Sequence, residues 1–376
     1  MADSKTSTII PTELSRYARH LALDEVGLEG QQQLKASSVL IVGAGGLGSP
    51  AALYLSAAGV GRIGIADYDN VDITNLQRQV LHGTDTLGAA KTDSAQTRIA
   101  NLNPHTTVET WGELTSHNAL EIIGKYDVVI DGSDNFPTRY LLNDACRLAV
   151  KPLIYGTVYR FEGQVTVFVE DGPCYRCLFP EPPPPEAVPS CATGGVLGVV
   201  PGIIGTLQAT EALKYILKIG DNLVGRLVLV DTLVMRFEEI SVARNRSCPL
   251  CGDEPVITSL IDYEDFCGTR HVPEVPTISV AELATTIDQV VLIDVREDWE
   301  RAIAAIDGTV DIPESELAQK LDQLPKDKPL VVYCRSGIRS ARSTDMLLRS
   351  DFDDVRNLTG GILAWADAID TGMAKY

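Results

Sequence analysis

The chain has 376 residues, of which 45% are hydrophobic, and its 51 acidic and 32 basic side chains give a formal net charge of −19. This length is enough for two domains. The negative charge argues against a general binding surface for nucleic acids or anionic membranes, because such a chain repels both. Residues 1–21 contain no apolar signal segment, so we expect a cytoplasmic protein with reduced cysteines.

Short apolar runs alternate with helix-like segments between residues 38 and 244. This alternation predicts an α/β domain with a mainly parallel sheet and helices on its faces. The later runs, 164–169 and 227–237, follow one another with less helix between them, so we expect antiparallel pairing there. The predicted strands are Val39–Val42, Arg62–Asp67, Val108–Thr110, Asp127–Asp131, Leu153–Thr157, Gly163–Val169 and Arg226–Val230.

The stretch VLIVGAGGLGS places Gly43, Gly45 and Gly48 in a G-x-G-x-x-G arrangement directly after a predicted strand. Asp67 follows about 20 residues later, where an acidic residue typically holds ribose hydroxyls. The glycines let the backbone approach a phosphate, and the N-terminus of the following helix favours the anion. A nicotinamide cofactor and an adenosine nucleotide both fit this signature.

The charged residues around this motif favour a triphosphate. Arg78 and Lys91 follow it, Arg19 precedes the first strand, and Asp134 and Asn135 lie at the end of another predicted strand. A triphosphate that is attacked at phosphorus needs cations on its phosphates and a carboxylate for a metal ion. We therefore expect ATP and Mg²⁺ rather than a nicotinamide cofactor.

Four motifs in the first two-thirds of the chain carry a family resemblance. GAGGLGS, DxDxVDxTNLQRQ, DGSDNFxTRYLxND and GTVYRFEGQVTVF resemble motifs of the ubiquitin-activating-like adenylyltransferases of molybdopterin and thiamine biosynthesis. The resemblance implies a Rossmann-like fold that adenylates the C-terminal glycine of a ubiquitin-like sulfur carrier protein ending in Gly-Gly. It does not say which carrier is served: molybdopterin, thiamine, cysteine or tRNA thiolation.

The same resemblance implies roles for individual residues. Gly46 and Asp67 would contact the nucleotide, and Asp134 would serve Mg²⁺. Arg19 would reach into the site of the other subunit, so the resemblance implies a homodimer. Three residues would hold the phosphates: Asn75, Arg78 and Lys91.

Two C-x-x-C pairs, Cys174 with Cys177 and Cys248 with Cys251, lie about 70 residues apart. Four thiolates complete the tetrahedral set of a structural Zn²⁺, and the wide spacing suits a clip between distant segments. A redox pair is the alternative, but the first pair leads into a proline-rich run rather than a helix. The resemblance also implies zinc at these positions.

Cys191 follows that proline-rich run, PEPPPPEAVPS. A cysteine on a connection near the nucleotide could be a nucleophile or an idle small residue. In the resembled family a cysteine here can form an acyl or persulfide link with the carrier. Cys146 and Cys267 are expected to be structural.

A second α/β pattern starts at Thr277, and Cys334 ends one of its strands just before a helix. The loop Cys334–Arg339 would wrap N–H groups around the sulfur, and Arg335 and Arg339 would add positive potential that stabilises a persulfide. A buried inert cysteine is the alternative. A cysteine phosphatase would need Arg where the chain has Ser340.

This loop resembles the six-residue loop of rhodaneses, and LIDVREDWERA, GGILAW and DIP resemble that family too. One departure is Ala305, where relatives often have His. We therefore expect an adenylation domain over 1–251, a linker over 252–276 and a smaller α/β rhodanese domain over 277–376. The sequence does not name the sulfur donor and leaves two candidates open, a cysteine desulfurase and thiosulfate. The alternatives are a nicotinamide oxidoreductase with an appended thiol domain and an inactive scaffold that binds a ubiquitin-like partner.

Overall fold

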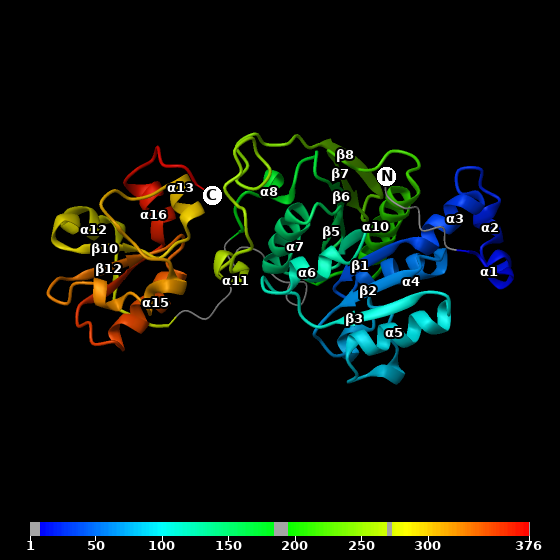
Figure 1. Ribbon diagram of the computed structural model, residues 1–376, viewed down its shortest axis with the longest axis horizontal. Helices are drawn as coiled ribbons and strands as arrows, with labels where there is room; N and C mark the ends of the chain where they lie inside the picture. Colours follow the sequence, from blue (N-terminus) through cyan, green and yellow to red (C-terminus); the bar gives the residue numbers. More distant parts are fainter. Residues whose placement is uncertain (1–7, 184–194, 269–272, 376) are drawn as a thin grey trace. The chain divides into compact units, whose positions relative to one another are not determined.

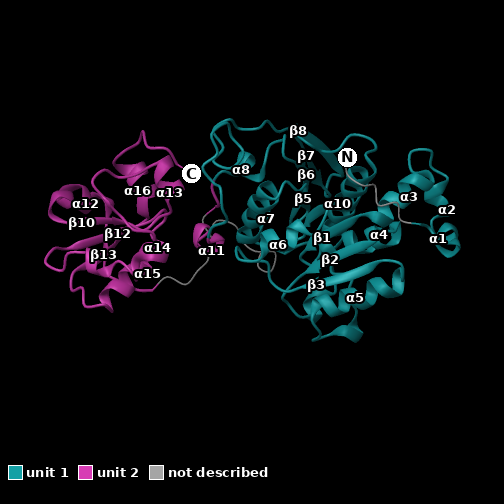
Figure 2. Ribbon diagram, in the orientation of Figure 1, with its two compact units in different colours: residues 1–180, 188–261 teal, residues 181–187, 262–376 magenta. Residues whose placement is uncertain are grey.

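A computed structural model describes residues 8–183, 195–268 and 273–375. The chain divides into two compact units, which Figure 2 shows in teal and magenta. The first comprises residues 1–180 and 188–261, and the second comprises residues 181–187 and 262–376. Among the described residues, none of the helices has both the length and the hydropathy required to cross a membrane.

The first unit is built on an eight-stranded sheet in the order β3-β2-β1-β4-β5-β6-β7-β8 (Figure 1). The pairs from β3 to β5 are parallel, and the pairs from β5 to β8 are antiparallel. This confirms a mainly parallel sheet with some antiparallel strands. The strands are β1 (Ser38–Val42), β2 (Arg62–Ala66), β3 (Thr107–Trp111), β4 (Val128–Asp131), β5 (Leu153–Tyr159), β6 (Glu162–Phe168), β7 (Arg226–Asp231) and β8 (Arg236–Ser241).

One predicted run, 227–237, is divided between two strands. Residues 232–235 form a turn, so β7 and β8 pair as an antiparallel hairpin. The apolar residues of this turn continue the apolar pattern of β7, and the pattern alone therefore suggests one longer strand.

Helices cover the sheet of the first unit, and strand β1 is buried along its whole length. The apolar helix α10 packs against α4, β5 and β6. Residues of β1, β2, α4 and α10 share one hydrophobic core. The helices are α1 (Pro11–Arg16), α2 (Ala18–Leu21), α3 (Gly27–Ala36), α4 (Gly48–Ala58), α5 (Lys91–Leu102), α6 (Ala119–Gly124), α7 (Phe136–Leu148), α8 (Tyr175–Leu178) and α10 (Val199–Leu217), with 3-10 turns at Ile73–Asn75 and Thr84–Thr86.

The strand order reverses at β1, because β2 lies on one side of it and β4 on the other. The loops that follow β1 and β4 therefore diverge, and a crevice forms outside the carboxyl ends of these strands. Open α/β sheets bind their ligands at such a point. The fold thus brings the glycine motif after β1 next to the Asp134 loop after β4.

The second unit contains a five-stranded, wholly parallel sheet in the order β11-β10-β12-β13-β9. This confirms the second, smaller α/β domain. Its strands are β9 (Thr277–Ile278), β10 (Val291–Asp294), β11 (Val310–Asp311), β12 (Leu330–Tyr333) and β13 (Val355–Leu358). Its helices are α11 (Tyr263–Phe266), α12 (Val280–Thr286), α13 (Asp298–Ile303), α14 (Glu314–Leu317), α15 (Ile338–Leu348) and α16 (Gly361–Ala368), with 3-10 turns at Ile287–Gln289 and Leu321–Gln323.

The segment expected as a linker, residues 252–276, is shared between the two units. Residues 252–261 belong to the first unit, and helix α11 belongs to the second. Tyr263, Asp265 and Phe266 of α11 are buried, so this part of the segment is packed structure.

Candidate functional site: a nucleotide pocket, a cysteine cluster and a sulfur loop

The glycine motif forms the turn from β1 into α4. Gly43 has a φ of +94°, and a Cβ at this position would lie 2.6 Å from the carbonyl oxygen of Gly132. A Cβ on Gly48 would collide with the carbonyl oxygen of Gly43. At Gly45 only Gln79 Nε2 would come near, at 3.7 Å. Gly43 and Gly48 therefore serve the packing of the turn, whereas Gly45 leaves room at the pocket.

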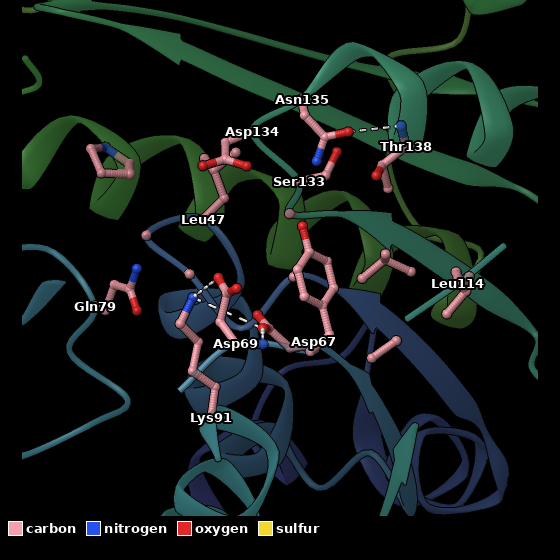
Figure 3. Close-up of a pocket in the computed structure, with 18 of the residues that line it drawn as sticks. Leu47, Asp67, Asp69, Gln79, Lys91, Leu114, Ser133, Asp134, Asn135 and Thr138 are labelled. Atoms are coloured by element: carbon pink, nitrogen blue, oxygen red, sulfur yellow. Dashed lines mark hydrogen bonds and ion pairs between the residues drawn. The ribbon is translucent and has the colours of Figure 1, made fainter. Parts of the chain in front are cut away.

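A pocket opens at the carboxyl ends of β1, β2 and β4 (Figure 3). It contains about 940 Å³ of space, open solvent included. Gly48, Asn75 and Arg19 are not among its lining residues. The predicted site residues that line it are Gly43, Gly45, Gly46, Asp67, Arg78, Lys91, Asp134 and Asn135.

Two backbone N–H groups hold the Asp67 carboxylate at the pocket. Its Oδ2 accepts a hydrogen bond from the Ala44 N–H, and its Oδ1 accepts one from the Asp69 N–H, both at 2.8 Å. The Lys91 ammonium lies 2.7 Å from Asp69 Oδ2 and 3.9 Å from Asp67 Oδ1, as the dashed lines in Figure 3 show. Lys91 is only 7% exposed, so the fold holds its charge at the pocket wall.

The loop after β4 presents a carboxylate and an amide to the same pocket. Asn135 caps α7, because its Oδ1 accepts from the Thr138 N–H at 2.9 Å. Asp134 is exposed, and its carboxylate makes no hydrogen bond or ion pair within the described part of the chain. A carboxylate without such partners is the type of ligand that Mg²⁺ uses together with phosphate oxygens.

A buried carboxylate supports this loop from below. Asp131 Oδ1 accepts from the Ser133 N–H at 2.9 Å and from the Ser133 hydroxyl at 2.6 Å. Burial raises the pKa of Asp131, while the nearby Arg139 guanidinium opposes that shift. Asp131 thus holds the turn that presents Asp134.

Two residues near the pocket, His82 and Arg139, are candidates for a functional role that the sequence did not indicate. His82 is buried behind the glycine turn, where its Nε2–H donates to the Ala44 carbonyl oxygen and its Nδ1 contacts the Ser94 hydroxyl oxygen, both at 2.9 Å. Burial lowers the pKa of His82, which keeps the ring neutral. Arg139 lines the pocket; it stands inside the DGSDNFxTRYLxND motif, but its position alone gave it no role.

The remaining predicted residues do not share one setting. Arg78 lines the pocket, with Nη1 donating to the Thr74 carbonyl oxygen at 3.1 Å. Asn75 lies outside the pocket, and its Oδ1 accepts a long hydrogen bond, 3.4 Å, from the Asp72 N–H. Arg19 is exposed on α2. Cys191 lies outside the described residues.

The four cysteines of the C-x-x-C pairs come together in the first unit. Their sulfur atoms all lie within 4.8 Å of one another. The closest approaches are 3.3 Å between Cys177 and Cys251, 3.6 Å between Cys174 and Cys248 and 3.9 Å between Cys174 and Cys177. Sulfurs bound tetrahedrally at about 2.3 Å from Zn²⁺ lie roughly 3.8 Å apart. The cluster therefore fits zinc, and four thiolates leave no position for water.

Cys334 lies at the end of β12, where its loop turns into α15. Its Sγ accepts from the Gly337 N–H at 3.1 Å and from the Ser340 hydroxyl at 3.3 Å. Gly337 has a φ of +98°, which lets the loop curl around the sulfur. The GGILAW segment holds the base of this loop, since the Ile362 N–H donates to the Cys334 carbonyl oxygen at 2.9 Å. Cys334 is 1% exposed.

The arginines of the loop have partners that the sequence did not reveal. Arg339 makes a bidentate pair with Glu300, at 2.5 and 2.6 Å, and a further ion pair with Asp265 of α11. Burial disfavours the charged form of Glu300, but Arg339 outweighs it and lowers the pKa of this carboxyl. Arg335 lies 4.9 Å from the Phe266 ring centre, also on α11. The carboxylates of Glu300 and Asp265 therefore offset part of the positive charge that we expected from these arginines. Helix α11 contacts both arginines.

Comparison with known proteins assigns both units to families. The ThiF family matches residues 17–250, and the rhodanese-like domain matches residues 279–368. Asp265 and Phe266 lie outside both matches.

Two relatives with named activities match most of the chain. A Mycobacterium tuberculosis protein named probable adenylyltransferase/sulfurtransferase MoeZ is 44% identical, over 98% of this chain and 97% of that protein. The sulfur carrier protein adenylyltransferase of Thermus thermophilus is 56% identical, over 69% of this chain and 98% of that protein.

A solved structure shares the fold of the first unit. The crystal structure of E. coli MccB with ATP has a TM-score of 0.54 and 20% identity, over 66% of this chain and 83% of that one. The sequence matches show that the chain belongs to the ThiF family and carries a rhodanese-like domain after its ThiF domain.

Proposed function

We propose that this protein uses ATP to adenylate the C-terminal carboxylate of a ubiquitin-like sulfur carrier protein and then converts it to a thiocarboxylate. One observation carries the proposal: a single chain holds both a phosphate-type pocket with Lys91, Arg78 and Asp134 and a cysteine loop with Cys334 at its centre. The names of two relatives support it: the Mycobacterium tuberculosis protein is named an adenylyltransferase/sulfurtransferase, and the Thermus thermophilus protein is named a sulfur carrier protein adenylyltransferase.

The first step takes place in the pocket of the ThiF domain. A carboxylate oxygen of the carrier's terminal glycine attacks the α-phosphorus of ATP, and the bond to pyrophosphate breaks. Gly45 and Gly46 allow the backbone to approach the phosphates, and Asp67 holds the ribose. Lys91 and Arg78 balance the phosphate charge in a pocket where electrostatic interactions are stronger than in water.

Mg²⁺ would be held by Asp134, and when bound it would offset charge on the phosphates. Asp134 suits this role because its carboxylate has no competing hydrogen bond or ion pair among the described residues. Asn75 would join the phosphate ligands from just outside the pocket. In a homodimer the exposed Arg19 would reach the site of the other subunit.

The second step uses the loop of the rhodanese-like domain. The Cys334 thiolate attacks the outer sulfur of a donor, either thiosulfate, which leaves as sulfite, or the persulfide of a cysteine desulfurase. The Gly337 N–H and the Ser340 hydroxyl stabilise the anionic sulfur. The terminal persulfide sulfur then attacks the acyl carbonyl, and AMP leaves.

The product is at first attached to Cys334 through a disulfide bond. A second thiol attacks the Cys334 sulfur, which releases the thiocarboxylate and leaves a new disulfide that an external thiol reduces. Cys191 is our candidate for this second thiol. The tether between the domains raises the effective concentration of the persulfide at the adenylate.

The four-cysteine cluster would hold Zn²⁺ in a structural role. It joins the segment after β6 to the segment after β8. A cytoplasmic location, where thiols stay reduced, agrees with both the cluster and the persulfide chemistry.

The division of labour can be tested by exchange of labelled pyrophosphate into ATP in the presence of a small carrier ending in Gly-Gly. Exchange reports the first step alone. We expect Asp134→Ala to lose exchange and Cys334→Ala to retain it. Loss of exchange in Cys334→Ala would contradict the assignment of Cys334 to the second step only.

A further inference from the structure

The two residues between Cys174 and Cys177 are not spacers. Tyr175 and Arg176 are both buried, and Arg176 is one of the largest fully buried side chains among the described residues. Their burial means that they pack against other parts of the first unit.

Both residues form hydrogen bonds with helix α7. Arg176 forms a bidentate pair with Asp144, from Nε to Oδ1 at 2.9 Å and from Nη2 to Oδ2 at 2.8 Å. The two side chains are 1% and 0% exposed. The Tyr175 N–H donates to Asn143 Oδ1 at 2.7 Å. Bidentate pairs of this kind fix orientation as well as adding energy.

Aromatic contacts continue this packing toward the N-terminus of α7. The rings of Tyr140 and Tyr175 meet edge to face, with centres 5.0 Å apart, and the Arg176 guanidinium lies 5.0 Å from the centre of the Tyr140 ring. The Tyr140 hydroxyl donates to the Phe179 carbonyl oxygen at 2.8 Å. Helices α7 and α8 are neighbours in the first unit (Figure 1).

The other end of α7 belongs to the nucleotide pocket. Asn135 caps it, and Asp134, Asn135, Thr138 and Arg139 line the pocket. About 14 Å of helix separates the cap from Asp144, at 1.5 Å per residue. A continuous helix over that length moves as one body. Contacts that hold Asn143 and Asp144 in place therefore also fix the position of the loop before α7, which carries Asp134.

We infer that Tyr175 and Arg176 are positioning residues that couple the four-cysteine cluster to the nucleotide pocket through α7. The inference rests on the proposed function, because it takes ATP–Mg as the ligand of the pocket. Coupling between two sites is reciprocal. If the cluster orders the pocket, then ATP–Mg bound in the pocket must stabilise the cluster.

The test is the affinity of the full chain for Zn²⁺, measured by equilibrium competition with a colorimetric chelator, with and without saturating ATP–Mg. We expect ATP–Mg to tighten Zn²⁺ binding about fivefold or more in the wild-type chain, at the lower end of typical coupling. Arg176→Lys keeps the charge but loses the bidentate geometry, and it should bring the ratio of the two affinities toward one. If Arg176→Lys fails to fold, the double variant Asp144→Asn with Arg176→Gln takes its place, because it removes both buried charges together.

Glu13→Gln is the matched control, because Glu13 is the buried acid of another salt bridge in the same unit, with Lys35. It should keep the wild-type ratio. A merely structural loss would weaken Zn²⁺ binding equally with and without ATP–Mg and leave the ratio unchanged. The inference is overturned if ATP–Mg does not tighten Zn²⁺ binding in the wild-type chain, or if the Arg176 variants keep the wild-type ratio. Calorimetric titration with ATP–Mg separates these outcomes from failure of the proposed function, in which ATP would not bind at all.

Discussion

The glycine turn makes opposite predictions for two neighbouring glycines. A methyl group at Gly48 would collide with the Gly43 carbonyl oxygen, so Gly48→Ala must displace the turn. Overpacking of this kind costs about 1–3 kcal/mol, which lowers the melting temperature by several degrees for a domain of this size. At Gly45 a methyl group would meet only Gln79 Nε2, at an ordinary 3.7 Å.

Gly45→Ala should therefore fold normally, and because Gly→Ala at a compatible site restricts the unfolded chain, it should gain about 0.4–1 kcal/mol of stability. The same methyl group occupies space that a phosphate needs, so ATP–Mg binding should weaken by about tenfold or more, equivalent to roughly 1.4 kcal/mol. Thermal melting followed by circular dichroism measures the stability, and isothermal titration calorimetry measures the affinity. Unchanged ATP affinity in Gly45→Ala, or an unchanged melting temperature in Gly48→Ala, would refute the reasoning.

Three further predictions concern other parts of the molecule. Because Asp265 ties α11 to the Cys334 loop through Arg339, Asp265→Asn should speed alkylation of Cys334 by iodoacetamide, whereas Glu314→Gln should not; equal rates by mass spectrometry would count against a role for α11. Below about pH 6.5 the unfolded chain protonates His82 while the folded chain keeps it neutral. The free energy of unfolding should therefore decrease as the pH is lowered, by at most about 1.4 kcal/mol per pH unit, and His82→Gln should flatten this slope in urea titrations. Removal of zinc by a chelator should lower the melting temperature of the ThiF domain but leave thiosulfate turnover at Cys334 intact, and a parallel loss of turnover would contradict the separate roles.

The sequence predicted those features that local constraints determine. Buried parallel strands read as short apolar runs, and a turn that admits no Cβ at Gly43 or Gly48 can only be glycine. The two C-x-x-C pairs needed no long-range information beyond their ligand chemistry, and the fold brings their sulfurs together. The rhodanese loop was visible for the same reason, since its six residues, Cys334–Arg339, are consecutive in the sequence.

Features that depend on contacts between distant residues were not visible. His82 supports the glycine turn from a position 38 residues away from its Ala44 acceptor, with no motif around it. The segment expected as a linker lacks periodicity because α11 is a single short turn of helix, yet Asp265 and Phe266 contact the arginines of the Cys334 loop. The Lys91 pairing with Asp69 likewise follows from the packing of α5 beside β2, which spacing alone does not specify.

The most direct test of the central claim follows the carrier protein itself. The full chain is incubated with a Gly-Gly-ending carrier, ATP–Mg and thiosulfate, and the C-terminus of the carrier is weighed by intact mass spectrometry. Our account predicts that one carboxylate oxygen is replaced by sulfur in the wild-type chain, and that Cys334→Ala leaves the carboxylate unconverted although pyrophosphate exchange continues. Thiocarboxylate formed by Cys334→Ala, or formed by the wild-type chain without ATP, would contradict it.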